Sequence, residues 1–279
     1  MAWELTGDVE KFAETAGDFL RSRPVQHTTL LTLVDTLRRR GAHAYASEDP
    51  VFGIWRTPSE VVAGVLLQTP PYPMMFSEIP REAVPAAVDM LADQPLTGVN
   101  MVAGAADTFV AEWRRRTGAA ATVHMRTRLY RLDALTPPPV LPPGRARPGE
   151  PRDREVAIRW MYEFFAFIGE RPRDVEPLVD ERIGDSLMTV WEVGGAPVSM
   201  VIRSRAQAGM VRVQNVYTPP DQRGKGYAGA ATTAATRAAL SAGATDVVLH
   251  TDLANPTSNA LYQRLGYRPI EDRTVVDFG

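Results

Sequence analysis

Cysteine is absent from this sequence of 279 residues, and so are long apolar runs and any large excess of one charge. Without cysteine, the chain can form neither a disulfide framework nor a cysteine nucleophile that stores an acyl group. The net charge of -2 gives no general attraction to nucleic acid or to an anionic membrane. Since no apolar run is long enough to span a bilayer and the first residues lack a basic-then-apolar signal pattern, we expect a cytoplasmic protein.

A proline-rich segment at residues 136–151 divides the chain. The hydrophobic content of 44% and the charged content of 23% are ordinary for a globular protein, and the length suits two domains. A proline run of this kind is not expected to join a helix or a sheet, because it favours extended polyproline II. We therefore predict one domain at 1–135, a linker at 136–152 and a second domain at 153–279.

The predicted elements follow the same order on both sides of this segment. Each half contains helices, a hairpin, a strand ended by Thr-Pro-Pro, a helix, a strand, a helix and a last strand, which predicts two units in tandem. In the first half we expect helices at 8–21, 26–40, 81–92 and 106–116, and strands at 52–57, 61–69, 72–77, 98–103 and 122–132. In the second we expect helices at 153–168, 173–184 and 257–265, an alanine-rich helix up to 240, and strands at 187–193, 197–203, 211–217, 246–252 and within 267–278.

A glycine-rich turn lies between the strand at 211–217 and the alanine-rich helix. The Pro-Pro pair at 219–220 ends the strand, and the motif Arg-Gly-Lys-Gly at 223–226 opens the helix. Such a turn directs unpaired backbone N–H groups and the positive end of the helix dipole at one point, which suits a phosphate group. Glycine permits close approach of the backbone, and Arg223 and Lys225 add positive charge.

Two nucleotide-binding patterns fit this turn less well. The P-loop pattern requires Ser or Thr after its lysine, whereas Lys225 is followed by Gly226. The dinucleotide fingerprint matches Gly224, Gly226 and Gly229, with Asp252 as the ribose-binding acid. Against it, a proline pair separates the strand from the glycines, and only about one further strand–helix unit follows.

The segment Arg-Gly-Lys-Gly-Tyr-Ala at 223–228 resembles the acetyl-CoA pyrophosphate loop of the GNAT superfamily of CoA-dependent N-acyltransferases. Residues 255–267, Asn-Pro-Thr-Ser-Asn-Ala-Leu-Tyr-Gln-Arg-Leu-Gly-Tyr, resemble a later helix of the same family. The resemblance covers roughly residues 186–278. It implies an α/β (α+β) fold of two tandem GNAT-like units, each a mixed, mostly antiparallel central sheet flanked by helices. The first unit has no glycine at 77–81, and Arg114 stands opposite Tyr262, so we expect that it does not catalyse.

The resemblance also implies a reaction, in which an amine attacks the acetyl thioester between two splayed parallel strands. Tyr262 matches the tyrosine that protonates the departing CoA thiolate in many family members, although an aromatic at this helix position can also serve only in the core. A backbone N–H or a widened strand near Asn215 is expected to polarise the thioester oxygen. For the general base the candidates are Glu163, Glu192 and Asp252, and a chain of water molecules is the alternative.

Acetyl-CoA is the acyl donor that the resemblance implies, with a small-molecule or peptide amine as acceptor. The positions that match its contacts are Val216, Tyr217, Thr218, Arg223, Gly224, Lys225, Gly226, Tyr227, Ala228, Gly229, Asn255, Ser258 and Asn259. Asn255 is equally suited to capping the next helix. The four histidines show no paired spacing, so we predict no metal site, and the oligomeric state is open. A non-catalytic acyl-CoA sensor and a nucleotide-dependent oxidoreductase stay as alternatives.

Overall fold

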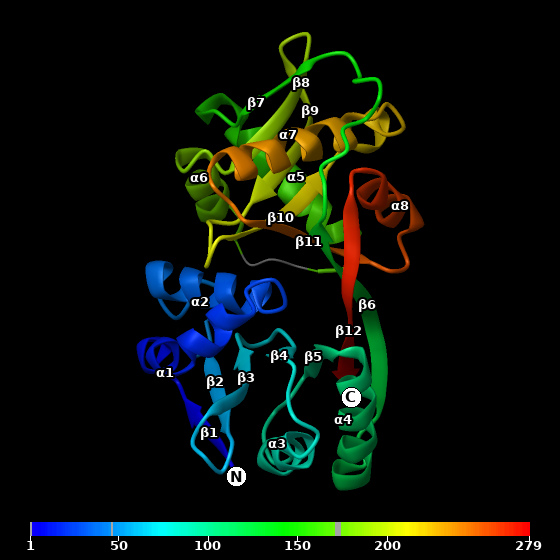
Figure 1. Ribbon diagram of the computed structural model, residues 1–279. Coiled ribbons are helices and arrows are strands. Elements are labelled where there is room, and N and C mark those ends of the chain that lie inside the picture. Colours follow the sequence, from blue (N-terminus) through cyan, green and yellow to red (C-terminus); the bar gives the residue numbers. More distant parts are fainter. Residues whose placement is uncertain (1, 46, 171–173) are drawn as a thin grey trace. The chain divides into compact units, whose positions relative to one another are not determined.

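The computed structural model describes residues 2–45, 47–170 and 174–279, and the chain forms two compact units (Figure 1). Unit 1 comprises Met1–Leu129, Thr251–Asn255 and Ile270–Gly279, and unit 2 comprises Tyr130–His250 and Pro256–Pro269. The boundaries of these compact units differ at the C-terminus from the boundaries that the sequence repeat predicts. We expected the last strand to belong with residues 153–279, but most of it is part of unit 1.

Unit 1 is a mixed sheet with four helices. Its helices are α1 (Val9–Ser22), α2 (Thr28–Arg40), α3 (Ala83–Leu91) and α4 (Ala103–Thr117). Its strands are β1 (Trp3–Thr6), β2 (Val51–Arg56), β3 (Val62–Gln68), β4 (Met74–Phe76) and β5 (Gly98–Val102), together with most of β6 (Ala121–Leu132) and of β12 (Tyr267–Phe278). The strand order is β1-β2-β3-β4-β5-β12. Only β4 and β5 are parallel among the ladders described for this unit.

Local sequence explains the ends of these elements. The helix α1 begins after Asp8, whose carboxylate accepts hydrogen bonds from the backbone N–H groups of Glu10 at 2.8 Å and Lys11 at 3.2 Å. The helix α2 ends at Gly41, which has a φ of 89°. The apolar faces of α3 and α4 pack with β4 and β5 in one core that includes Phe76 and Phe109, and β12 pairs with β5 beside it.

Unit 2 repeats this order of elements. Its helices are α5 (Arg154–Phe167), α6 (Glu176–Gly184), α7 (Tyr227–Ser241) and α8 (Pro256–Arg264). Its strands are β7 (Arg145–Pro148), β8 (Met188–Val193), β9 (Ala196–Arg203), β10 (Met210–Tyr217) and most of β11 (Asp246–Asp252). The strand order is β11-β10-β9-β8-β7, and β10 and β11 are its parallel pair. The predicted fold class is confirmed, since each unit contains mixed and mostly antiparallel strands flanked by helices.

Small side chains place α7 close to its sheet. Ala231, Ala235 and Ala239 are fully buried on the inner face of the helix, in a core shared with β8 to β11. The predicted helix at 173–184 corresponds to α6, although its first predicted residue, Arg173, lies outside the described residues.

Two strands were not predicted, and one of them corrects our expectation for the proline-rich segment. Within that segment β7 pairs with β8, with Arg145 opposite Glu192 and Pro148 opposite Thr189. This pairing is possible because β7 is at the edge of the sheet and its proline is the last residue, where no ladder N–H is required. The other missed strand, β1, has only four residues. The proposed boundaries at 1–135, 136–152 and 153–279 stay a prediction about the sequence repeat.

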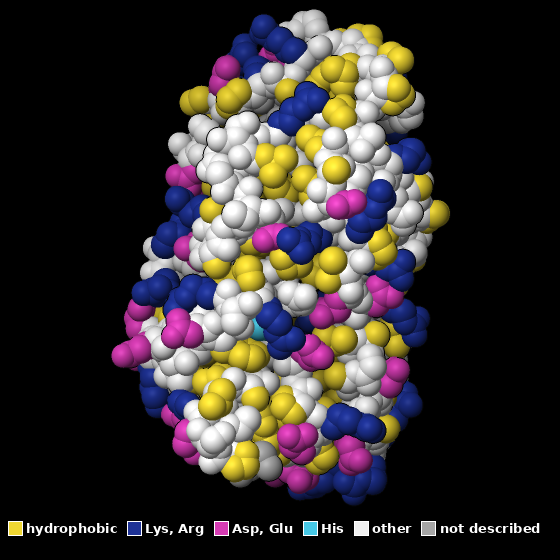
Figure 2. Space-filling view, viewed as in Figure 1, with side chains coloured by type: hydrophobic (Ala, Val, Ile, Leu, Met, Phe, Trp, Pro, Cys, Tyr) yellow, Lys and Arg dark blue, Asp and Glu magenta, His cyan; other side chains and the backbone are white. Residues whose placement is uncertain are grey.

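Charged side chains of both signs are interspersed with apolar ones on the face shown in Figure 2. Several form ion pairs within one unit, such as Arg38 with Glu10 at 2.8 Å and Arg154 with Asp180 at 2.6 Å. None of the helices in the described ranges is long and apolar enough to cross a bilayer.

Candidate active site

The two parallel strands of unit 2 separate after a short ladder. Met210, Val211 and Arg212 of β10 pair with residues 246–248 of β11, and the described ladder ends there. Beyond Arg212, β10 continues along β9 up to Tyr217. We call the region beyond this ladder the unit 2 fork. The resemblance implied that two parallel strands separate at this place.

A bulge in β10 borders the unit 2 fork. Gln214 pairs with Ile202 and Tyr217 pairs with Met200, so three residue steps on β10 face two steps on β9. The extra residue is accommodated at Asn215, which has a φ of 47°, a conformation that few residues other than glycine adopt. The widened strand predicted near Asn215 is therefore present.

The glycine-rich turn is exposed and opens α7. Gly224 and Gly226 have φ values of 76° and 83°, which glycine adopts without strain, and Gly226 is the N-cap of the helix. Residues 223–226 are exposed. Within the described ranges, the backbone N–H groups of residues 224–229 have no acceptor in the protein. The turn thus presents a row of unpaired donors at the positive end of a helix.

Two cations flank these donors. Arg223 donates from Nε to the carbonyl oxygen of Thr218 at 3.0 Å, and its guanidinium carbon lies 5.4 Å from the ring centroid of Phe167. Lys225 donates from Nζ to the side-chain oxygen of Gln222 at 3.0 Å. Neither cation has a carboxylate partner among the described residues, so both are available to an anion at the turn.

Tyr262 of α8 lies in the same core as the parallel pair. Its side chain is 7% exposed and shares an apolar cluster with Val211 of β10, Val247 of β11 and Tyr227 at the start of α7. Its hydroxyl makes no hydrogen bond within the described part of the chain. Burial, and to a lesser extent the neighbouring Tyr267, raises the pKa of Tyr262 above its ordinary value. The phenol therefore keeps its proton at neutral pH and has a free O–H.

Glu163 of α5 is linked to the end of β10. The Tyr217 hydroxyl donates to its carboxylate at 2.8 Å, and Arg159 lies 3.9 Å from the same carboxylate. Burial is the largest cause that raises the pKa of Tyr217, and the hydrogen bond to Glu163 adds to it. The candidate base and a predicted donor-binding residue are thus in direct contact, and the Glu163 side chain stays 42% exposed.

The other two candidate bases have structural partners. Glu192 accepts hydrogen bonds from Arg147 at 2.6 Å, Arg145 at 3.2 Å and Arg152 at 3.4 Å. The hydrogen bond from Arg147 is the main cause that lowers the pKa of Glu192, which makes it a poor proton acceptor. Asp252 accepts a hydrogen bond from the backbone N–H of Ala254 at 2.9 Å, and it belongs to unit 1.

The remaining predicted contacts have varied surroundings. The Asn259 side-chain oxygen accepts a hydrogen bond from the Tyr130 hydroxyl at 2.8 Å, a partner that no sequence signal indicated. The Thr218 hydroxyl lies 2.9 Å from that of Ser199. Ser258 is partly exposed at the start of α8, and Ala228 is partly exposed in the first turn of α7. Val216, next to the bulge, is partly buried against the apolar cluster. Asn255 belongs to unit 1, and its backbone N–H donates to the carbonyl oxygen of Asp252 at 3.1 Å.

Unit 1 has a corresponding fork between β4 and β5, and a side chain fills it. Met74 and Met75 pair in parallel with Val99 and Asn100. The Arg273 guanidinium, from β12, donates to the carbonyl oxygen of Phe76 at 2.6 Å and to the backbone and side-chain oxygens of Asn100 at 3.0 and 2.9 Å. Arg273 is 5% exposed. No local sequence pattern indicates these contacts of Arg273, because they depend on where β12 pairs.

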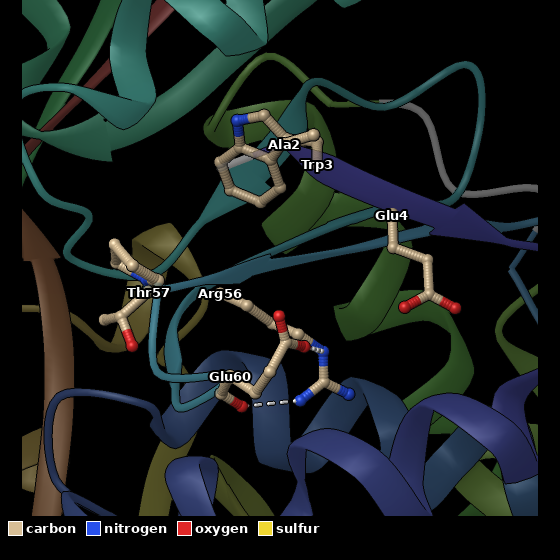
Figure 3. Close-up of a pocket in the computed structure, with 7 residues that line it drawn as sticks. Ala2, Trp3, Glu4, Arg56, Thr57 and Glu60 are labelled. Carbon is tan, nitrogen blue, oxygen red and sulfur yellow. Dashed lines mark hydrogen bonds and ion pairs between the residues drawn. The ribbon is translucent and has the colours of Figure 1, made fainter.

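Unit 1 also has a surface hollow of about 400 Å³ beside β1 and the β2–β3 turn (Figure 3). Arg56 lines it and donates a hydrogen bond to the carbonyl oxygen of Glu60 at 2.9 Å. The hollow contains none of the residues that the sequence singled out. The described residues include no cluster of three or more His, Asp or Glu side chains suited to a metal ion.

Part of the chain matches a known protein family in sequence. Residues 155–267 match the acetyltransferase (GNAT) family. This segment of the chain, within residues 155–267, is a GNAT-family domain. A search of curated proteins gave no match in sequence. The family as a whole transfers an acyl group from CoA to an amine, and the chain is an acyltransferase of this type.

Solved structures support the GNAT fold. The chain is similar to a GCN5-related N-acetyltransferase from Sphaerobacter thermophilus, with 18% identity, a TM-score of 0.61, and 87% and 84% of the two chains covered. It is also similar to a GNAT-family acetyltransferase from Colwellia psychrerythraea, with 12% identity, a TM-score of 0.59, and 100% and 99% covered. A tandem GNAT protein from the clavulanic acid biosynthesis pathway matches with 13% identity, a TM-score of 0.55, and 99% and 98% covered. At these identities the likeness concerns the fold alone.

Proposed function

We propose that unit 2 transfers an acetyl group from acetyl-CoA to an amine. The observation that carries this proposal is the turn at 223–229, exposed at 223–226, where unpaired backbone N–H groups lie beside two cations that have no acidic partner among the described residues. A diphosphate is the part of CoA that such a point recognises. The resemblance adds Asn255, Ser258 and Asn259 of the following turn and helix as further contacts.

The thioester end of the donor enters the unit 2 fork. An extended pantetheine arm pairs with the backbone of β10 at Val216, Tyr217 and Thr218 as an added strand would, because β11 no longer pairs with β10 there. The bulge at Asn215 interrupts the regular pairing of β10 with β9 next to the place proposed for this arm. A backbone N–H at that point can stabilise the negative charge that develops on the thioester oxygen.

The chemistry is a direct attack. The amine nitrogen bonds to the thioester carbon, the carbon–sulfur bond breaks, and the electron pair leaves with the sulfur of CoA. Tyr262 donates its phenolic proton to this thiolate, which its free hydroxyl and its retained proton allow. The amine proton passes to Glu163, or to water beside it, and the carboxylate keeps its position through Tyr217.

The experiment is turnover of acetyl-CoA by the purified full chain with a panel of small-molecule and peptide amines. We expect release of free CoA thiol, detected with a thiol-reactive dye, together with the acetylated amine in mass spectrometry. Unit 1, with its filled fork, is proposed not to catalyse, and the proposed location of the protein is the cytoplasm. Turnover that depends on a nicotinamide nucleotide instead would contradict the proposal.

A non-catalytic acyl-CoA sensor is the second candidate. The hydrogen bond from Tyr130 to Asn259 favours this candidate. If residues 255–267 have only a structural role, the turn at 223–229 is left as the part of the site that binds CoA. Tight binding of acetyl-CoA without thiol release from any amine would select this candidate.

A further inference from the structure

Hydrogen bonds hold both ends of a proline-rich segment of unit 2. We call residues 133–144 the strap. At its start, the backbone N–H groups of Asp133 and Thr136 donate to the carbonyl oxygens of Gly266 and Leu265, both at 3.0 Å. At its end, the Trp191 indole N–H donates to the carbonyl oxygen of Pro143 at 3.0 Å. The strap is therefore held by the turn after α8 at one end and by β8 at the other.

Between these anchors the strap passes the first turn of α7 (Figure 1). A Cβ atom placed on Gly229 would lie 3.8 Å from the Pro138 ring, and one placed on Gly226 would lie 3.9 Å from the Pro142 ring. Both distances are ordinary van der Waals contact. Residues 139–141 therefore arch beside the helix start that carries the unpaired N–H groups.

The middle of this arch carries two apolar side chains that are open to solvent. Val140 is 82% exposed and Leu141 is 53% exposed. Five of the seven residues at 137–143 are prolines, which stiffen the backbone and leave little conformational entropy to lose when a ligand binds. A stiff, solvent-facing apolar arch is suited to contact with a flat, mostly apolar group.

We infer that the strap is the outer wall of the donor site, with Val140 and Leu141 packed against the adenosine end of the CoA thioester. The inference rests on the proposed function, since it takes the diphosphate to lie at the turn. With the thioester end in the unit 2 fork, the adenosine end is the part of the donor that stays outside at the exposed turn. The strap is the neighbouring element there, through Pro138 and Pro142.

The test compares two donors with the double variant Val140→Ser/Leu141→Ser. Acetyl-CoA contains the adenosine end, whereas the acetyl thioester of 4′-phosphopantetheine lacks it. We expect the KM for acetyl-CoA to rise about three- to tenfold in the variant, since apolar contact area is lost, while the KM for the truncated donor stays unchanged. Val61→Ser is the matched control, because Val61 is an exposed valine of unit 1 at 60%.

An unchanged KM for acetyl-CoA in the double variant would overturn the inference. An equal rise for both donors would also overturn it, because the strap would then act only as a brace for the turn. Failure of the wild-type protein to use or bind either donor would instead overturn the proposed function, so the two failures are distinguishable. Because both side chains are exposed, the melting temperature of the variant is expected to match that of the wild type.

Discussion

The guanidinium of Arg273 donates a hydrogen bond to the backbone carbonyl oxygen of Phe76 at 2.6 Å. In unit 1 this bond, with those to Asn100, closes the ends of the parallel pair β4 and β5. In unit 2 the backbone beyond the corresponding ladder of β10 and β11 is proposed to receive the pantetheine arm. The two units thus share the same order of strands. In unit 1 the Arg273 side chain occupies the end of the parallel pair, and in unit 2 the corresponding place is the candidate donor site.

Replacing Arg273 with methionine is expected to destabilise unit 1. The change leaves the carbonyl oxygen of Phe76 and the side chain of Asn100 without their buried donor, so we expect a loss of about 3 kcal/mol in the free energy of unfolding. Urea denaturation measures this loss. Arg268→Met is the control, since the Arg268 side chain is 59% exposed and is expected to change stability by less than about 0.5 kcal/mol. Equal stabilities of the two variants would contradict a structural role for Arg273.

The hydroxyl of Tyr262 is expected to act in turnover. Tyr262→Phe removes the proposed proton donor and should lower kcat by about 10²-fold, with little change in the Kd for CoA. Steady-state thiol release and a binding titration measure the two quantities. Tyr267→Phe is a close control, because its ring lies 6.2 Å from that of Tyr262 and its hydroxyl bonds only Thr236, at 2.7 Å, among the described residues. Equal effects on kcat would show that Tyr262 serves only the core.

Much of the fold follows from the sequence, because local periodicity determines the elements. The proline pair at 219–220 and the glycines after it mark the end of β10 and the start of α7, and the repeated element order gave the tandem arrangement. The pairing of β12 with β5 depends on tertiary structure instead. Sequence patterns therefore did not indicate that most of β12 lies in unit 1, nor the contacts that Arg273 makes there. The edge strand β7 was missed because the prolines of the surrounding segment favour an extended linker, although an edge position tolerates the one proline of the strand.

Buried histidine in unit 1 predicts a dependence of stability on pH. Burial is the main cause that lowers the pKa of His27 below 6.5, and the positive charges of Arg23 and Arg273 add to it, against a hydrogen bond with Leu20. Below pH 6.5 the unfolded chain binds a proton that the folded chain does not. The contribution of His27 to the free energy of unfolding is therefore complete above pH 6.5. As the pH falls below 6.5 towards the pKa of His27 in the folded protein, the free energy of unfolding decreases by at most about 1.4 kcal/mol per pH unit.

His27→Gln should remove this contribution. Urea denaturation at pH 7.5 and 5.5 compares the variant with the wild type, and the difference between the two pH values is the quantity that matters, since the variant lowers stability at both. The exposed His43 and His124 are the same in both proteins. An unchanged pH dependence in the variant would show that His27 is not responsible.

The glycine that caps α7 is expected to be required for binding. Gly226 and Gly195 share a φ of 83°, and a Cβ atom at either position meets no atom closer than 3.9 Å. Alanine at either position should therefore lower stability by about 1 kcal/mol. Only Gly226→Ala changes the turn that is proposed to bind the diphosphate, so only this variant should raise the Kd for CoA, by at least about tenfold. An equal Kd in both variants would place the diphosphate elsewhere.

The candidate site was predictable in part. Residues 223–229 and Tyr262 follow motifs that are contiguous in sequence, and the structure places them on one end of a helix and in one apolar core. The partners that decide the other roles come from distant segments. Arg147 donates a hydrogen bond to Glu192 and lowers the pKa of this candidate base, and Tyr130 donates a hydrogen bond to Asn259. Neither pairing has a local sequence signal, because each depends on how strands and helices pack.

Calorimetric titration of acetyl-CoA into the full chain tests the central claim most directly. The turn of unit 2 and the filled fork of unit 1 together predict a stoichiometry of one donor per chain, with the site strongly weakened in Gly226→Ala and retained in Gly195→Ala. Two donors per chain, no binding, or a site that Gly226→Ala leaves intact would contradict the account.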